Sequence, residues 1–452
     1  MTKPNFLTIG QASKQIDAGK LSPVDLAGAC LKQIDRLEPK LKAWVTIDRD
    51  AVLSSAQNFE KELDKKGPRG PLHGIPIGIK DIYYTAGMKT TACSKVYADF
   101  VPEYDATAVT RLKAAGAIVL GKTVTTEFAA GDPSPTLNPW DFAHTPGGSS
   151  SGSAVSVAAR MCPAAMGSQT GGSILRPASY NGVVGLKPTF GRISVYGVIP
   201  VAWSFDTIGP MVNCVDDAAI MLQALAGYDD NDAGSADEPV PDYLHQMQRY
   251  DKPPRIGLIR DFLVQANAEV QKHTRQAAQK LAKAGAVVEE VSAPPSYALS
   301  PHFQWVIGCV ENAAYHEEQY RTKADLYSHQ IRRRMEVGFL TPGVQYLQAQ
   351  RLRRVYRREM EALARQWDVL LTPSTPAAAP RDLSTTGDPV FQSPWTSCGL
   401  PTITIPSGLS PSTGLPLGVQ FASASFTESR LLGAARWCER VLDVSLTPPI
   451  AK

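Results

Sequence analysis

The feature that most limits how this 452-residue chain can fold is a pattern that occurs twice. A helical stretch is followed by Ala-Gly-Ala and then by apolar, largely β-branched residues, at 106–120 and again at 268–291. An apolar strand is also expected at 256–259, so the second copy lies in a strand-helix-strand order. Such a unit pairs its strands in parallel through a right-handed crossover. We therefore expect an α/β fold with a large mixed or parallel sheet covered by helices.

The N-terminal region is expected to be helical. Ser22 can cap and Pro23 can open a helix that has one apolar face and is predicted to end before Pro39. The residues of that face are Ala27, Cys30, Leu31 and Ile34. We assign residues 1–65 to an N-terminal helical segment that packs on a single domain spanning residues 1–452.

A second helical region, from about residue 295 to residue 366, is expected to form a substrate pocket or lid. Its aromatic residues Phe303, Trp305 and Tyr315 could line an apolar acyl or aryl pocket, although aromatic residues in a helix often belong to the core. A basic run in the same region is interpreted as a solvated helix face and not as a nucleic-acid patch. The run contains Arg351, Arg353, Arg354, Arg357 and Arg358. The acidic segment 228–242 is predicted to be a surface loop and a seam between two parts of the chain.

Charge and composition exclude several classes of partner. The chain has 46 Lys and Arg against 43 Asp and Glu, a net charge of +3, too small to indicate a nucleic-acid or membrane surface. No apolar run approaches the ~20 residues of a membrane span, and we expect a soluble, cytoplasmic protein. The seven cysteines are scattered and odd in number, which favours reduced thiols. Because the histidines form no metal-binding pattern, we expect no metal and no cofactor.

Two short motifs match known patterns in the wrong context. Residues 116–123 match the phosphate-loop pattern G-x-x-x-x-G-K-[ST], but there the helix precedes the loop and the spacer is itself a strand. Residues 148–152 match G-x-S-x-G, which would make Ser150 the nucleophile of an α/β-hydrolase. That pattern is short, and no oxyanion motif precedes it. We therefore give neither motif a function.

Three segments fit one chemical scheme better. They are GIPIGIKD, which contains Lys80, PGGSSSGS, which contains Ser149, and GSQTGGSILRP, which contains Ser173. In order and spacing they resemble the amidase signature family, and in particular its malonamidase-like branch. The resemblance continues through residues 184–192, 204–210, 399–408 and 414–420. It implies a single α/β/α domain with a large mixed sheet covered by helices on both faces.

The residues suit the roles that the resemblance implies. A serine hydroxyl needs a base within hydrogen-bond reach, and burial can keep Lys80 neutral for that purpose. By resemblance, Ser149 follows a cis peptide bond and relays protons between Lys80 and the nucleophile Ser173. Glycines at 171 and 172 allow a tight turn in which the N–H groups of Thr170 to Ser173 bind the oxyanion.

Two positions depart from the family pattern. Position 169 is Gln where many members have Asp, and Arg176 follows the nucleophile by three residues where many members have two. In the malonamidase-like branch the matching arginine binds a substrate carboxylate, so Arg176 is a candidate for that role or for a structural one.

The expected function is hydrolysis of the C–N bond of a small amide, aryl amide or carbamate by a monomer or homodimer. A urethane or urea substrate would use the same residues. An amidotransferase A-like subunit, which supplies ammonia to a partner, is an alternative that the departures at 169 and 176 disfavour. A silent binding protein is disfavoured because all three reactive side chains are present.

Overall fold

A mixed sheet of eleven strands crosses residues 3–452, the part of the chain that the computed structural model describes. The strand order is β1-β3-β2-β4-β6-β5-β10-β11-β9-β7-β8. Pairing is parallel on both sides of β2 and of β7 and antiparallel elsewhere. The bounds are β1 Trp44–Ile47, β2 Pro76–Lys80, β3 Ile118–Thr123, β4 Ala164–Gln169, β5 Val184–Lys187, β6 Thr207–Val212, β7 Arg255–Ile259, β8 Val287–Val291, β9 Val369–Pro373, β10 Thr402–Leu409 and β11 Pro416–Ala422.

Helices flank this sheet, and the strands β2, β4 and β6 at its centre are buried along their whole length. Strands with both faces covered are apolar almost throughout, as these are. The helices are α1 Ile9–Asp17, α2 Pro23–Leu41, α3 Arg49–Lys66, α4 Thr107–Ala114, α5 Ser151–Ala158, α6 Leu175–Asn181, α7 Val215–Leu225, α8 Tyr243–Gln248, α9 Arg260–Leu263, α10 Ala268–Lys283, α11 Ser300–Lys323, α12 His329–Leu340, α13 Gly343–Ala364, α14 Ser393–Cys398 and α15 Glu428–Leu442. The expected α/β fold with a helix-covered mixed sheet is confirmed.

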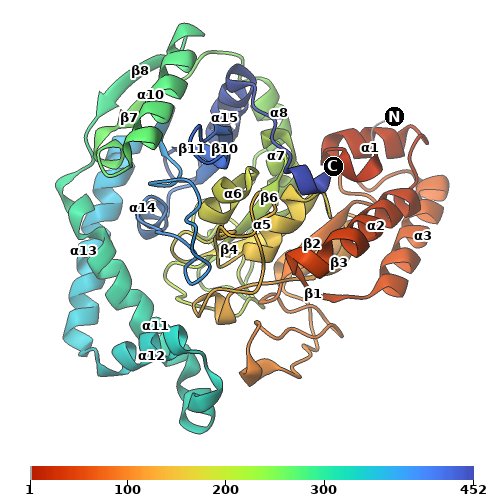
Figure 1. The fold of residues 1–452 in the computed structure, drawn as a ribbon, viewed down its shortest axis with the longest axis horizontal. Helices are drawn as coiled ribbons and strands as arrows, with labels where there is room; N and C mark the ends of the chain where they lie inside the picture. Colours follow the sequence, from red (N-terminus) through yellow and green to blue (C-terminus); the bar gives the residue numbers. More distant parts are fainter. Residues whose placement is uncertain (1–2) are drawn as a thin grey trace.

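The N-terminal and C-terminal parts of the chain occupy different ends of the sheet. In Figure 1, α1, α2 and α3 lie beside β1, β2 and β3, whereas β7, β8 and α10 lie at the opposite end. Helices α11, α12 and α13 form a separate group below that second end. Lys3, the first described residue, contacts Lys452, because its ammonium donates a hydrogen bond to the Lys452 carbonyl oxygen at 3.1 Å.

The strand-helix-strand unit predicted at 256–291 is present, because β7 and β8 pair in parallel and α10 connects them. The predicted helix-to-strand passage near 106–120 is α4 followed by β3. The predicted end of the first long helix is wrong, since α2 continues through Pro39 to Leu41. Leu37 and Leu41 are both buried in the core, and a proline in the last turn removes only one helical hydrogen bond.

The phosphate-loop match at 116–123 falls on β3, with α4 before it, as its context predicted. Lys122, which would contact a phosphate in such a loop, is buried and donates hydrogen bonds to the Tyr83 carbonyl and to Thr85 Oγ1. Its ammonium therefore has protein acceptors of its own.

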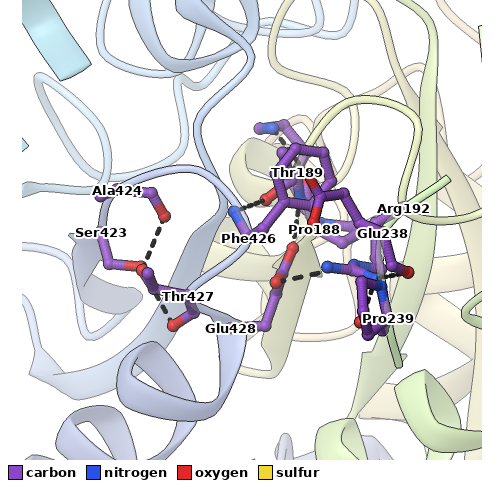
Figure 2. Close-up of polar contacts among 11 residues, drawn as sticks. Pro188, Thr189, Arg192, Glu238, Pro239, Ser423, Ala424, Phe426, Thr427 and Glu428 are labelled. Carbon is purple, nitrogen blue, oxygen red and sulfur yellow. Dashed lines mark hydrogen bonds and ion pairs between the residues drawn. The ribbon is translucent and has the colours of Figure 1, made fainter. Parts of the chain in front are cut away.

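The family-like segment 184–192 is fixed to the C-terminal helix α15 by a buried polar clasp, which Figure 2 shows. Glu428, at the first position of α15, accepts a hydrogen bond from the Thr189 N–H at 2.9 Å and lies 3.8 Å from Arg192 Nε. The Arg192 Nη1 donates to the Glu238 and Pro239 carbonyls at 3.0 Å each. These contacts tie three distant parts of the chain together.

Candidate active site

The register of the sheet brings the predicted reactive residues to one edge. Strands β2 and β4 are parallel neighbours with Ile79 opposite Met166, so Lys80 and the residues after Gln169 leave the sheet side by side. Strand β6 runs antiparallel to β4, with Thr207 opposite Gln169. The end of β2, the end of β4 and the start of β6 therefore meet at the candidate site.

Lys80 is buried and contacts three hydroxyl groups. Its Nζ lies 2.7 Å from Ser149 Oγ, 2.9 Å from Ser150 Oγ and 2.8 Å from Ser168 Oγ. A neutral amine has two N–H donors and one lone pair, so in that form one of the three hydroxyls must donate to it. The Ser150 Oγ accepts from the Ser168 N–H at 3.2 Å and donates to the Ser168 carbonyl at 3.3 Å. That leaves Ser149 and Ser168 as the possible donors to the amine.

The surroundings of Lys80 favour the neutral amine. Burial lowers the pKa of its ammonium to about 7, while the negative charge of Asp206 and the thiol of Cys93 act in the opposite direction. Desolvation disfavours the charged form of a buried lysine. A substantial fraction of Lys80 is therefore unprotonated at neutral pH.

Ser149 and Ser173 line the same cavity, which has a volume of about 490 Å³. The peptide bond between Gly148 and Ser149 is cis, as the family resemblance implies. Within the described residues Ser173 Oγ makes no hydrogen bond, and Ser149 Oγ bonds only to Lys80. Ser150 is fully buried and does not line the cavity, which argues against the α/β-hydrolase interpretation. It occupies the N-cap position of α5, but its side chain makes no capping hydrogen bond.

The turn from Thr170 to Ser173 joins β4 to α6. None of its four backbone N–H groups donates a hydrogen bond within residues 3–452. Gln392 approaches Gly172 closely, since a Cβ at position 172 would lie 2.8 Å from Gln392 Oε1 and would force that side chain to shift. The turn thus presents unpaired donors beside Ser173, as a site for an oxyanion requires.

The Gln169 side chain links this turn to α6 and to Thr396 by hydrogen bonds. Its side-chain oxygen accepts hydrogen bonds from the N–H groups of Ile174 at 2.9 Å and Leu175 at 3.1 Å, at the start of α6. Its side-chain nitrogen donates to Thr396 Oγ1 at 3.0 Å, and the Thr396 hydroxyl donates to the Gly171 carbonyl at 2.7 Å. A neutral amide therefore makes the hydrogen bonds to α6 without placing a charge at position 169.

Arg176 is near the site, but its guanidinium is hydrogen-bonded to protein atoms. Its Nη1 donates to the Gly387 carbonyl at 2.8 Å, and its Nη2 donates to the Gly148 carbonyl at 2.8 Å and to Thr386 Oγ1 at 2.9 Å. The group joins the segment before Ser149 to the loop around 386. This geometry favours the structural role over the carboxylate-binding one.

Arg334 of α12 was not identified from the sequence, although it also lines the cavity. Within the described residues it forms no ion pair, its Nε has no hydrogen-bond partner, and its guanidinium lies 5.6 Å from the ring centre of Trp305. Of the three aromatic residues considered for the pocket, only Trp305 lines it. Phe303 packs on Tyr356 in the core, and Tyr315 contacts Tyr97. An arginine within a run of arginines carries no sequence signal that separates it from its exposed neighbours.

Residues 3–452 contain no group of His, Cys, Asp or Glu side chains that could hold a metal ion. No helix in that range is both long and apolar enough to cross a bilayer.

The α/β sheet thus brings a buried lysine, a serine after a cis peptide bond and a glycine-rich serine turn to one edge. A sequence profile of the Amidase family matches residues 25–432. The chain therefore belongs to the amidase family.

Relatives and solved structures of two kinds are similar to the chain. The A subunit of a glutamyl-tRNA(Gln) amidotransferase from Carboxydothermus hydrogenoformans is 36% identical, with 96% of this chain and 97% of that protein covered. The native peptide amidase from Stenotrophomonas maltophilia superposes with a TM-score of 0.87 at 31% identity, covering 99% of both chains. A structure described as a vestigial protein complex revealing the origins of an s-triazine catabolic enzyme gives a TM-score of 0.91 at 30% identity, covering 97% of this chain and 99% of that one. The curated relatives thus include amidotransferase A subunits, the alternative that the departures at 169 and 176 disfavour.

Proposed function

We propose that this chain is an amidohydrolase in which Ser173 is the nucleophile, Ser149 the bridging hydroxyl and Lys80 the base. The observation that carries this proposal is the buried Lys80 amine, 2.7 Å from Ser149 Oγ, beside a serine turn in the same cavity. A serine becomes nucleophilic when such a base can accept its proton.

In this mechanism Ser173 Oγ attacks the carbonyl carbon of the amide. Its proton passes to Ser149, whose own proton passes to the neutral amine of Lys80. The N–H groups of Thr170, Gly171, Gly172 and Ser173 stabilise the tetrahedral oxyanion. The proton then returns along the same path to the leaving nitrogen, and water hydrolyses the ester on Ser173. The missing hydrogen bond between Ser149 and Ser173 is expected to form on substrate binding, since catalytic contacts are often longer in the free enzyme.

The substrate of this site is proposed to be a small amide that carries a carboxylate. Arg334 lines a cavity of about 490 Å³ and forms no ion pair within the described residues, and the charge of Asp206 acts on its guanidinium. Guanidinium groups bind carboxylates through charge-assisted hydrogen bonds. Asp388 lines the same cavity and can pair with an ammonium group, so an amino acid with a side-chain amide, which carries both a carboxylate and an ammonium, fits both charges. Helices α11 and α12, part of the region 295–366, supply Trp305 and Arg334 and are proposed to cover the pocket.

The second candidate is the amidase component of an amidotransferase, which would release ammonia from glutamine for a partner. The curated relatives favour it, because the amidotransferase protein of Carboxydothermus hydrogenoformans aligns over 96% of this chain. Glutamine also has the carboxylate and ammonium that Arg334 and Asp388 can bind. As an amidohydrolase the chain would act as a monomer or homodimer, whereas the amidotransferase alternative requires a partner protein.

One experiment tests the chemistry and separates the candidates. The purified chain is incubated with L-glutamine, butyramide and phenyl carbamate, and ammonia release is measured together with the intact mass of the protein. We expect an acyl adduct on the Ser173 peptide and no turnover by Ser173→Ala. Glutaminase activity that rises when a co-purifying protein is added would support the amidotransferase. Full activity of Ser173→Ala would overturn both candidates.

A further inference from the structure

Asp206 lies directly behind the turn that carries the proposed nucleophile. The pairing of Thr207 with Gln169 places Asp206 beside Thr170. One carboxylate oxygen of Asp206 accepts a hydrogen bond from the Thr170 hydroxyl. The other accepts the N–H groups of Val201 at 2.8 Å and Ala202 at 3.0 Å. The buried carboxylate thus anchors the first residue of the turn to the loop before β6.

Helix α11 holds the same turn and the same loop. Gln304 donates a hydrogen bond to the Thr170 carbonyl at 3.0 Å. Glu311, further along the same helix, accepts the Ser204 N–H at 2.9 Å and the Ser204 hydroxyl. Glu311 is fully buried, and its hydrogen-bond partners within the described residues are all uncharged. A buried carboxylate costs free energy unless donors surround it, so these hydrogen bonds define its position.

Helix α13 completes the enclosure of the loop. Tyr346 donates its hydroxyl to Glu311 at 2.9 Å, and Gln350 donates to Ser204 Oγ at 3.2 Å. The Arg353 guanidinium donates to the Ser204 carbonyl and lies 4.2 Å from the ring centre of Phe205, which itself lines the cavity. Every residue of the segment 204–206 is therefore held, on one side by α11 and α13 and on the other by Thr170.

We propose that Asp206 is a positioning residue that orients the oxyanion turn through the Thr170 hydroxyl, and that Glu311 of α11 fixes the loop from which Asp206 acts. This inference rests on the proposed function, because it assigns the turn to oxyanion binding. The Thr170 side chain fixes the orientation of its own peptide units, and the N–H of Gly171 follows from that orientation. A misplacement of about 1 Å at such a site can cost on the order of 10²-fold in rate.

The inference is tested on the full chain with a fluorophosphonate probe. Such a probe forms an Oγ–P bond with an activated serine and releases fluoride, so no natural substrate is needed. The maximal labelling rate and the probe concentration at half that rate are measured separately by intact mass. Thr170→Val removes the donor but keeps the shape, and Thr170→Ser restores the donor.

We expect Thr170→Val to lower the maximal labelling rate about 10- to 100-fold with little change in half-saturation, and Thr170→Ser to stay within a few-fold of wild type. Measured at pH 9, where Lys80 is unprotonated with or without the Asp206 charge, Asp206→Asn should lower the rate similarly, and the double variant Thr170→Val/Asp206→Asn should be no slower than the slower single variant. Glu311→Gln should also slow labelling, whereas Glu317→Gln, on the exposed surface of α11, should not.

Additive effects in the double variant, or wild-type labelling of Thr170→Val, would overturn the inference. If Asp206→Asn does not fold, the comparison of Thr170→Val with Thr170→Ser still decides it. Labelling of Ser173→Ala at the wild-type rate would instead refute the proposed nucleophile, which is a separate result.

Discussion

Lys80 differs from an ordinary lysine in that its hydrogen-bond neighbours, among the described residues, are hydroxyls and not carboxylates. Serine hydroxyls can hydrogen-bond to both the charged and the neutral form of Lys80. Burial therefore determines which form is favoured, and it lowers the pKa of Lys80 to about 7. The neighbouring charges are that of Asp206, which favours the ammonium, and that of Cys93 when ionised. Burial raises the pKa of the Cys93 thiol to about 12, so that group is neutral near pH 7.

The pH dependence of kcat/KM follows from this. Lys80 acts as a base only when it is unprotonated, so activity should be low below pH 6 and rise through a midpoint near 7. A lysine with its ordinary pKa would place the midpoint between pH 10 and 11. The measurement is kcat/KM from pH 5 to 9 with an uncharged amide. A flat profile over that range would contradict a lysine base.

Ser150 and Ser173 should respond in opposite ways to alanine substitution. Ser173→Ala removes the nucleophile and should abolish turnover. Ser150→Ala should reduce activity only mildly, because Ser150 Oγ is outside the cavity and contacts Lys80 and the Ser168 backbone. Steady-state rates and circular dichroism of both variants are the measurements. The opposite ranking would favour the α/β-hydrolase scheme.

Substitutions of Arg334 and of Arg176 should distinguish a role in substrate recognition from a structural role. Arg334→Met should lower kcat/KM for an amide with a carboxylate by about 10- to 100-fold, the equivalent of about 1.5–3 kcal/mol for a charged hydrogen bond. It should change a neutral amide little. Arg176→Met removes three hydrogen bonds to protein atoms and should affect both substrates equally. Selective loss of the anionic substrate in Arg176→Met would return the carboxylate-binding role to Arg176.

The elements differ in how far their sequences predicted them. Strand β7 and helices α4 and α10 follow from local patterns, since apolar periodicity and flanking Gly residues are properties of short segments. Helix α2 passes Pro39 because burial of Leu37 and Leu41 outweighs a local preference. The edge strand β1, inside the predicted helical segment 1–65, is four residues long and pairs with β3, far along the chain. Its pairing could not be predicted from the segment itself.

The candidate site shows the same division. Lys80, Ser149 and Ser173 lie in segments whose sequences resemble those of the amidase signature family, so the sequence alone could identify them as candidate site residues. Arg334 and Glu311 lie in helices whose local patterns resemble any solvated or packed helix. Their special environment, a cavity for one and a buried polar cluster for the other, arises only when α11, α12 and α13 assemble.

The clasp between Arg192 and Glu428 should matter for stability. Both side chains are buried, and removal of one member of a buried pair leaves the other uncompensated. Arg192→Met should lower the free energy of unfolding by about 3–5 kcal/mol. Arg321→Met, which breaks an exposed pair with Glu317, should cost about 0–1 kcal/mol. Urea unfolding of both variants is the measurement, and equal losses would contradict a structural role for the clasp.

The strand order divides the sheet into two halves, and each half is built from one continuous part of the sequence. Strands β1 to β6 fill one contiguous half of the sheet and β7 to β11 the other, joined where β5 pairs with β10. The acidic segment 228–242, predicted as a loop and a seam, lies between the two sets in sequence. The cavity nevertheless takes Ser149 and Ser173 from the first half and Arg334 from the second. Each half alone therefore lacks part of the proposed site.

This arrangement predicts that the chain tolerates circular permutation at the seam. Lys3 and Lys452 are in contact, so a short Gly-Ser linker can join residue 452 to the N-terminal segment. New ends between Val240 and Pro241 would fall just beyond the Arg192 contacts to Glu238 and Pro239. We expect this permutant to fold and to keep its amide hydrolysis within a few-fold of the native order, because no strand pairing is cut.

A matched permutant opened between Thr386 and Gly387 should be inactive, since it cuts the loop that Arg176 binds and that lines the cavity. Thermal unfolding and amide turnover of both permutants are the measurements. The seam permutant should keep a melting temperature near that of the native chain, because β5 and β10 still pair and the clasp to α15 is intact. Loss of folding on opening at the seam would show that continuity through 228–242, and not the packing of the two halves, holds the sheet together.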